Sequence, residues 1–236
     1  RSLSWMLECY ENGTIRRRTI KGLIPKQSLV ELLQEMEKVE RYEDCVTIKK
    51  VIDRIYNPLE INLVAVSKGQ DKKKVKELLT MGHNSFGENR MQEAIPKWEN
   101  IISNDLNLHY IGALQSKKVK EIYNKFDVIE TLDTESSAKK IAECNERKVK
   151  KDNPKIYIQI NIGNESQKRG LLPSEVEGFL NMCREKYKLN ISGAMCLPPK
   201  TNKPSKYFKL MKEICLKYKL HDISMGMSND YLSAIE

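Results

Sequence analysis

The sequence predicts an α/β protein built as a (β/α)₈ barrel of the TIM type. From residue 61 onward, short apolar runs alternate with segments of helical periodicity. Seven such runs are each followed by a helical segment, in units of roughly 20 to 35 residues. Parallel strands joined in this way need helices over them. Because one more unit would complete eight, a barrel is favoured over an open doubly wound sheet. The open sheet stays as the alternative, although no G-x-G-x-x-G follows any strand.

The elements follow one another in a regular order. The first strand, INLVAVS, precedes DKKKVKELLTMG, in which Val75, Leu78 and Leu79 recur at helical spacing. Later strands are expected in SFGEN, LHYIGAL, DVIETLD, KIYIQINIG, ISGAMCLPP and DISMGMS. Several helices are expected to begin at oxygen-bearing caps, namely Asp71, Ser116, Thr134, Ser174 and Asn229.

The N-terminal part has a different pattern. Two apolar series at helical spacing, Leu29 to Val39 and Cys45 to Ile55, predict two helices that meet near residues 40–44. The second helix can precede the first barrel strand, so we expect residues 1–46 to form a helical extension of unassigned role and residues 47–236 to form the barrel. An alternative hypothesis gives these helices the function and treats the barrel as degenerate.

Composition narrows the function classes. The net charge is +9, but the lysines fall within amphipathic helices such as DKKKVKELL, which is typical of solvated faces rather than of a nucleic-acid site. No apolar run approaches the ~20 residues of a membrane span. The six cysteines form no C-x-x-C pair and the three histidines have no metal-ligand spacing. We therefore expect a cytoplasmic protein with reduced thiols and no metal site.

The ends of the strands carry the candidate chemistry, because ligands of parallel α/β folds bind there. INLVAVSK places Lys68 directly after the first strand. An amine that loses solvation at a barrel mouth becomes nucleophilic and can form a Schiff base with an aldehyde such as pyridoxal phosphate (PLP). By itself, a lysine at a strand end is more often a solvated charge.

A second strand end could bind an anion. SMGMSND, residues 224–230, offers hydroxyls, a glycine backbone and helix N–H groups. No strand end carries a histidine, so a Ser-His-Asp hydrolase is not expected and we assign no catalytic residue.

Together these segments resemble the pyridoxal phosphate homeostasis protein family, whose members are single-domain barrels related to the N-terminal domain of alanine racemase. The resemblance lies in LVAVSK, FGENRMQEA, LHYIGALQSKKVK, QINIGNESQKRGL, GAMCLPP and ISMGMSNDYLSAI, which follow in the family's order over residues 60–236.

The resemblance implies roles for five residues. Lys68 would hold PLP as an aldimine, Ser224 and Ser228 would lie at its phosphate, Asn89 would line the cofactor, and Lys168 would be a second lysine near it. It also implies a monomeric carrier that hands PLP to dependent apoenzymes without turnover. A PLP-dependent racemase or decarboxylase is the enzymatic alternative.

One departure from the family concerns the eighth unit. Family members continue into an eighth strand and a G-S-T-x-V-R-I-G-like segment, whose arginine completes the phosphate site. The sequence ends at Glu236, so we expect a barrel without this unit and with one charge-assisted phosphate contact fewer, a difference of about 1.5–3 kcal/mol.

Overall fold

A computed structural model describes residues 24, 26–38, 48, 61–99, 101, 105–147, 152–201 and 203–235. The chain divides into two compact units, Arg1–Ile61 and Asn62–Glu236. In the first unit, helix α3 spans Lys26–Lys38 and buries Leu29, which confirms the first of the two predicted N-terminal helices. The second predicted helix and the boundary at residues 46 and 47 lie outside the described residues, except for Ile48.

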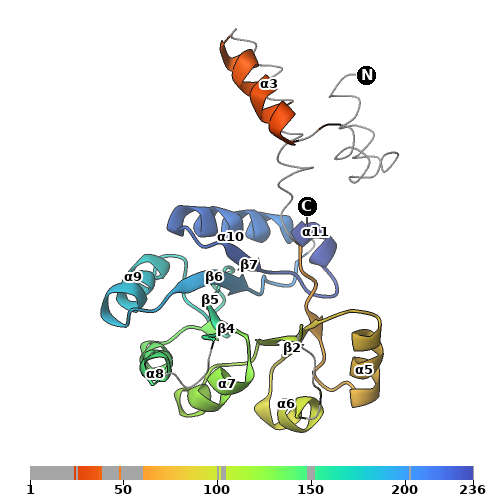
Figure 1. The fold of residues 1–236 in the computed structure, drawn as a ribbon. Helices are drawn as coiled ribbons and strands as arrows, with labels where there is room; N and C mark the ends of the chain where they lie inside the picture. Colours follow the sequence, from red (N-terminus) through yellow and green to blue (C-terminus); the bar gives the residue numbers. More distant parts are fainter. Residues whose placement is uncertain are drawn as a thin grey trace. The chain divides into compact units, whose positions relative to one another are not determined.

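The described residues of the second unit form a parallel seven-stranded sheet whose strands are paired in chain order, from β1 to β7. This confirms the α/β class and the predicted strand sequence. The sheet curves so that its helices lie along its outer side (Figure 1). The strands are β1 Ala65–Val66, β2 Ser85–Glu88, β3 Asn107–Tyr110, β4 Val128–Leu132, β5 Lys155–Ile160, β6 Ile191–Cys196 and β7 Asp222–Ser224.

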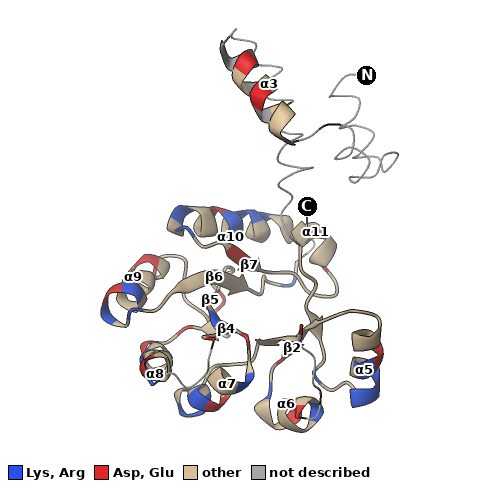
Figure 2. Cartoon of the chain, in the orientation of Figure 1, with Lys and Arg blue, Asp and Glu red and all other residues tan. Residues whose placement is uncertain are grey.

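The helices alternate with these strands. They are α5 Lys72–Thr80, α6 Met91–Trp98, the 3₁₀ segment η2 Ser116–Lys118, α7 Val119–Lys125, α8 Glu135–Glu146, α9 Val176–Asn181, the π-helical turn η3 Met182–Lys186, α10 Ser205–Tyr218 and α11 Tyr231–Ile235. Lysines occur together with acidic residues on α5, α6, α7, α8 and α10, whereas α11 carries no charged residue (Figure 2). Within the described part of the chain, none of the helices combines the length and the apolar character of a membrane-spanning segment.

The main core lies between the sheet and the helices. β4 is buried along its whole length, and Ile122, Tyr123 and Phe126 of the α7 region are at most 1% exposed. Burying side chains of this size contributes about 1.5–3 kcal/mol each. This layer fixes the middle of the sheet and thereby the strand ends of β2 to β6.

The first strand is shorter than the sequence predicts. Only Ala65 and Val66 form the strand, and Ile61 and Leu63 are 60% and 63% exposed. β1 and β7 are the two end strands of the described sheet, so each pairs on one side only. The apolar pattern of INLVAVS therefore marks a segment that has fewer neighbours than a central strand.

Two of the five predicted helix caps are confirmed. Asp71 accepts a hydrogen bond from the Lys73 N–H, and Thr134 accepts one from the Ser137 N–H. The other three are wrong, because neighbouring residues precede those helices: Gln115 precedes the 3₁₀ segment η2, Glu175 precedes α9, and Asp230 bonds back to the Met227 N–H before α11.

Candidate functional site

The five predicted site residues all follow or end strands of the parallel sheet. Lys68 follows β1, Asn89 follows β2, Lys168 lies in the loop after β5, Ser224 ends β7 and Ser228 follows it. In a parallel sheet the carboxyl ends of the strands share one rim, so the fold brings the five residues to the same rim. Lys68 and the two serines lie at opposite ends of the strand order.

Lys68 occupies a tight turn at the end of β1. The Gln70 N–H donates to the Ser67 carbonyl at 3.1 Å, and Gly69 has a φ of +66°. This positive φ at the third position is typical of a type II turn and explains the glycine. Lys68 is exposed, and its amine has no hydrogen-bond or ion-pair partner among the residues that the structure describes.

Side chains alternate between the two sides of the sheet in the segment that precedes Lys68. A Cβ on Gly87 would lie 3.2 Å from Val64 and 3.5 Å from Val66, so these two valines lie over the same side of the sheet. Ser67, between Val66 and Lys68, instead bonds to Glu88 beneath α6. β1 ends at Val66 and Lys68 lies in the turn that follows, so the alternation of the strand ends before Lys68.

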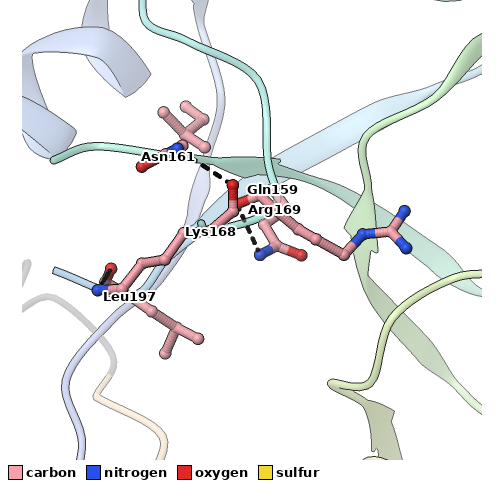
Figure 3. Close-up of a pocket in the computed structure, with 6 residues that line it drawn as sticks. Gln159, Asn161, Lys168, Arg169 and Leu197 are labelled. Atoms are coloured by element: carbon pink, nitrogen blue, oxygen red, sulfur yellow. Dashed lines mark hydrogen bonds between the residues drawn. The ribbon is translucent and has the colours of Figure 1, made fainter. Parts of the chain in front are cut away.

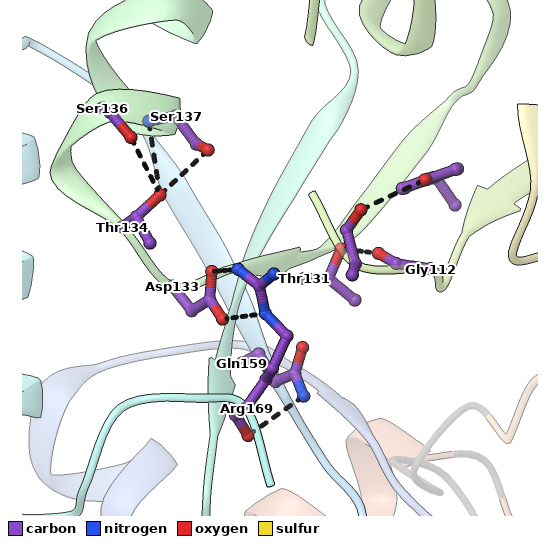
Figure 4. Close-up of polar contacts among 10 residues, drawn as sticks. Gly112, Thr131, Asp133, Thr134, Ser136, Ser137, Gln159 and Arg169 are labelled. Atoms are coloured by element: carbon purple, nitrogen blue, oxygen red, sulfur yellow. Dashed lines mark hydrogen bonds and ion pairs between the residues drawn. The ribbon is translucent and has the colours of Figure 1, made fainter. Parts of the chain in front are cut away.

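Asn89 is held by a close backbone approach. A Cβ on Gly112 would lie 2.0 Å from the Asn89 carbonyl oxygen, so only glycine fits there. The Thr131 hydroxyl donates to the Gly112 carbonyl at 2.6 Å, as Figure 4 shows. This fixes the backbone at the ends of β2 and β3, while the Asn89 side chain is partly exposed and has no partner within the described chain.

Ser224 belongs to a polar chain that links β3, β4 and β7. Its hydroxyl donates to Glu130 Oε2 at 2.6 Å, and Glu130 Oε1 lies 2.6 Å from His109 Nδ1. His109 and Glu130 are buried. The proton of the Ser224 hydroxyl is therefore already donated to a carboxylate. The sequence-based prediction missed His109 and Glu130, although each is a polar residue within an otherwise apolar strand.

The residues after Ser224 offer several free donors. Gly226 has a φ of +90°, and the Met227 N–H donates to Asp230 Oδ1 at 2.6 Å. In the described chain the N–H groups of Gly226, Ser228 and Asn229 have no acceptor, and Ser228 is exposed. Because the Met227 N–H is already bonded, Ser228 and Asn229 are the two of these residues that offer adjacent free N–H groups, a feature of anion-binding loops.

Lys168 lies in an ordered loop beside a small hollow of about 130 Å³ (Figure 3). Asn161 orders this loop by donating to the Glu165 and Lys168 carbonyls at 2.8 Å and 3.3 Å. The Lys168 ammonium donates to the Pro198 carbonyl at 3.0 Å and pairs with Glu165 at 2.5 Å. The hollow is lined by Gln159, Ile160, Asn161, Lys168, Arg169 and Leu197.

Arg169 lines both this hollow and a second one of about 370 Å³. Its guanidinium makes two bonds, of 3.0 Å and 2.9 Å, to Asp133 (Figure 4). These hydrogen bonds raise the pKa of Arg169. Neither hollow is lined by Lys68, Asn89, Ser224 or Ser228.

Comparison with known proteins identifies the family. Residues 48–235 match the family model described as alanine racemase, N-terminal domain. The pyridoxal phosphate homeostasis protein of Schizosaccharomyces pombe is 33% identical over 200 residues, which cover 80% of this chain and 83% of that protein. The chain belongs to the pyridoxal phosphate homeostasis protein family. A homeostasis protein of Aquifex aeolicus is 29% identical over 211 residues, covering 81% of this chain and 91% of the relative.

Solved structures agree with this family assignment. PipY of Synechococcus elongatus, 27% identical, superposes with a TM-score of 0.68 without PLP and 0.65 with PLP bound, over 75% of this chain and 87% of PipY. An alanine racemase of Clostridium difficile is 16% identical with a TM-score of 0.54, over 71% of this chain and 46% of the racemase. This second likeness shows the fold only.

In this homeostasis-family chain, the predicted site residues form two groups. Lys68, Asn89 and Ser228 have side chains without partners among the described residues, whereas Lys168 and Ser224 are each engaged by a carboxylate. Within the same described part of the chain, no three His, Cys, Asp or Glu side chains form a group that could hold a metal ion.

Proposed function

We propose that the chain binds pyridoxal phosphate through Lys68 and serves in its intracellular homeostasis. The observation on which this proposal rests is the exposed Lys68 amine at the carboxyl end of β1, which has no partner among the described residues. Support comes from the relatives named for pyridoxal phosphate homeostasis and from PipY, whose structure has PLP bound.

The chemistry of Lys68 fits an aldehyde ligand. A neutral lysine amine adds to an aldehyde carbon and forms a C=N bond with loss of one water, so no oxidant or reductant is required. Lys68 needs to release no ion pair before it reacts, since none holds it in the described structure.

The residues after β7 fit the phosphate end of the ligand. The Ser228 hydroxyl and the free N–H groups of Gly226, Ser228 and Asn229 are donors suited to an anion. Asp230 disfavours phosphate binding here, because its carboxylate already accepts the hydrogen bond of the Met227 N–H. Ser224 would contribute to phosphate binding only after its hydroxyl turns away from Glu130. Asn89 and Lys168 remain proposed neighbours of the cofactor.

We propose a carrier rather than an enzyme. Catalysis on a bound substrate requires a second group that exchanges protons. Lys168, the second lysine that the resemblance implies near the cofactor, is held by Glu165 and by the Pro198 carbonyl. We further propose a cytoplasmic monomer that transfers the cofactor to apoenzymes that depend on it.

The test is spectroscopic titration of the purified chain with PLP. We expect a new visible absorbance that saturates at one equivalent in the wild type and is lost in Lys68→Ala. Lys76→Ala, which removes an exposed lysine of α5, is the matched control and should bind as the wild type does. An unchanged absorbance in Lys68→Ala would rule out the assignment.

A further inference from the structure

A buried ion pair lies beneath the turn that carries Lys68. Glu88, at the end of β2, is fully buried, and its Oε1 accepts bonds from Lys97 Nζ at 2.8 Å, from the Trp98 indole at 3.0 Å and from the Ser67 hydroxyl at 2.7 Å. Lys97 is 8% exposed. Two charges removed from water are thus held directly under the end of β1.

Helix α6 contacts the turn on both sides of Lys68. On one side, Lys97 Nζ donates to the Ser67 carbonyl at 2.5 Å. On the other side, the Gly69 N–H donates to Glu93 Oε2 at 3.2 Å. The two peptide groups that flank Lys68 therefore each have a partner from α6, in addition to the bond between Ser67 and Gln70.

This arrangement is a poor way to stabilise a fold. Well-packed apolar residues of similar volume commonly replace a buried ion pair without loss of stability. In addition, Glu88 Oε2 is buried without a hydrogen-bond partner, which leaves part of the cost of burying the carboxylate unrecovered. Unlike apolar residues, the pair supplies a fixed ammonium group, which donates a hydrogen bond to the Ser67 carbonyl directly before Lys68.

We propose that Lys97, seated on Glu88, and Glu93 are positioning residues that fix the orientation of Lys68. The cofactor-related part of this inference rests on the proposed function. The part that concerns the turn itself can be tested on the chain without any cofactor.

The principal variant is Lys97→Met with Glu88→Gln, which removes both charges and keeps an acceptor for Ser67 and Trp98. Measurements on the cofactor-free full chain are amide hydrogen exchange of residues 67–70 and competitive acetylation of Lys68 against the exposed Lys73. We expect exchange of the Gln70 amide to rise at least tenfold relative to β4 amides, and relative acetylation of Lys68 to change at least threefold. With PLP added, bond formation should slow at least tenfold.

The matched control is Lys140→Met with Glu143→Gln. This pair on α8 has the same 2.8 Å separation, but its lysine is 50% exposed, so all three measurements should match the wild type. Glu93→Ala provides a second arm that does not disturb the buried pair, and it should raise exchange of the Gly69 amide at least threefold.

The outcomes separate the two proposals. The positioning role would be overturned if the double variant folded and showed wild-type amide exchange of residues 67–70 and wild-type acetylation of Lys68. If the double variant did not fold, wild-type exchange of the Gly69 amide in Glu93→Ala would overturn it instead. If the wild type did not bind PLP, the proposed function would fail, whereas altered exchange and acetylation in the variants would still support positioning.

Discussion

Replacing Gly112 by alanine tests whether the ends of β2 and β3 are packed as tightly as the structure shows. The new Cβ would lie 2.0 Å from the Asn89 carbonyl oxygen and 2.7 Å from its carbon. Both neighbours are backbone atoms, so the strands themselves must separate. Overpacking of this kind costs about 1–3 kcal/mol, and each kcal/mol lowers Tm by about 2–4 °C in a domain of this size. We expect Tm to fall by about 2–12 °C.

The assay is thermal unfolding followed by circular dichroism, with Gly178→Ala as the matched control. Gly178 lies within α9, and a Cβ there meets nothing within 4 Å. The same substitution should therefore stabilise by about 0.5–1 kcal/mol, because alanine is the better helix former. Because Gly112→Ala also moves Asn89, we expect it to weaken PLP binding. A Gly112→Ala variant as stable as the wild type would refute the reasoning about this contact.

Three further predictions follow from single side chains. Asp230→Asn should tighten PLP binding about three- to tenfold by calorimetry, since it removes a negative charge near the phosphate donors; weaker binding would contradict this placement. Hydrogen bonds from Lys186 and Tyr187 hold the pKa of Glu135 below its usual value. The ionised Glu135 therefore stabilises the fold fully when the pH is above the usual pKa of a glutamate, and this contribution is lost as the pH falls through the lowered pKa. Glu135→Gln should therefore lower Tm slightly at neutral pH, and this difference should shrink as the pH falls through the lowered pKa; a difference that does not depend on pH would count against the pairing. Burial raises the pKa of Cys183 and of Cys196 to about 12, so mass spectrometry should find both unalkylated by iodoacetamide at mildly alkaline pH until the chain is denatured.

The sequence predicted the strand order well because burial on both sides leaves a clear signal. β5 is buried from Ile156 to Ile160, and the run KIYIQINIG shows this as mostly apolar character. The same signal overestimated β1, since INLVAVS is apolar but pairs along only two residues. An apolar run does not indicate how many neighbouring strands are available to cover it.

The polar contacts of the site could be predicted only in part. Lys68 and Ser228 were predicted because they lie in segments that follow strands and that resemble the family's motifs. The bond between Ser224 and Glu130 joins residues 94 positions apart, and its existence depends on the curvature of the sheet. Glu88 was identifiable as a charged residue in a buried strand, but its pairing with Lys97 requires the position of α6 on the sheet.

The most direct test of the account is to trap the cofactor on the chain and locate it. The full chain is mixed with PLP, reduced with borohydride, digested and analysed by peptide mass spectrometry. We predict one pyridoxyl-phosphate adduct, on the peptide that contains Lys68, and its loss in Lys68→Ala. An adduct found instead on Lys168 in the wild type, or no adduct at all, would contradict the assignment of Lys68 as the residue that binds PLP.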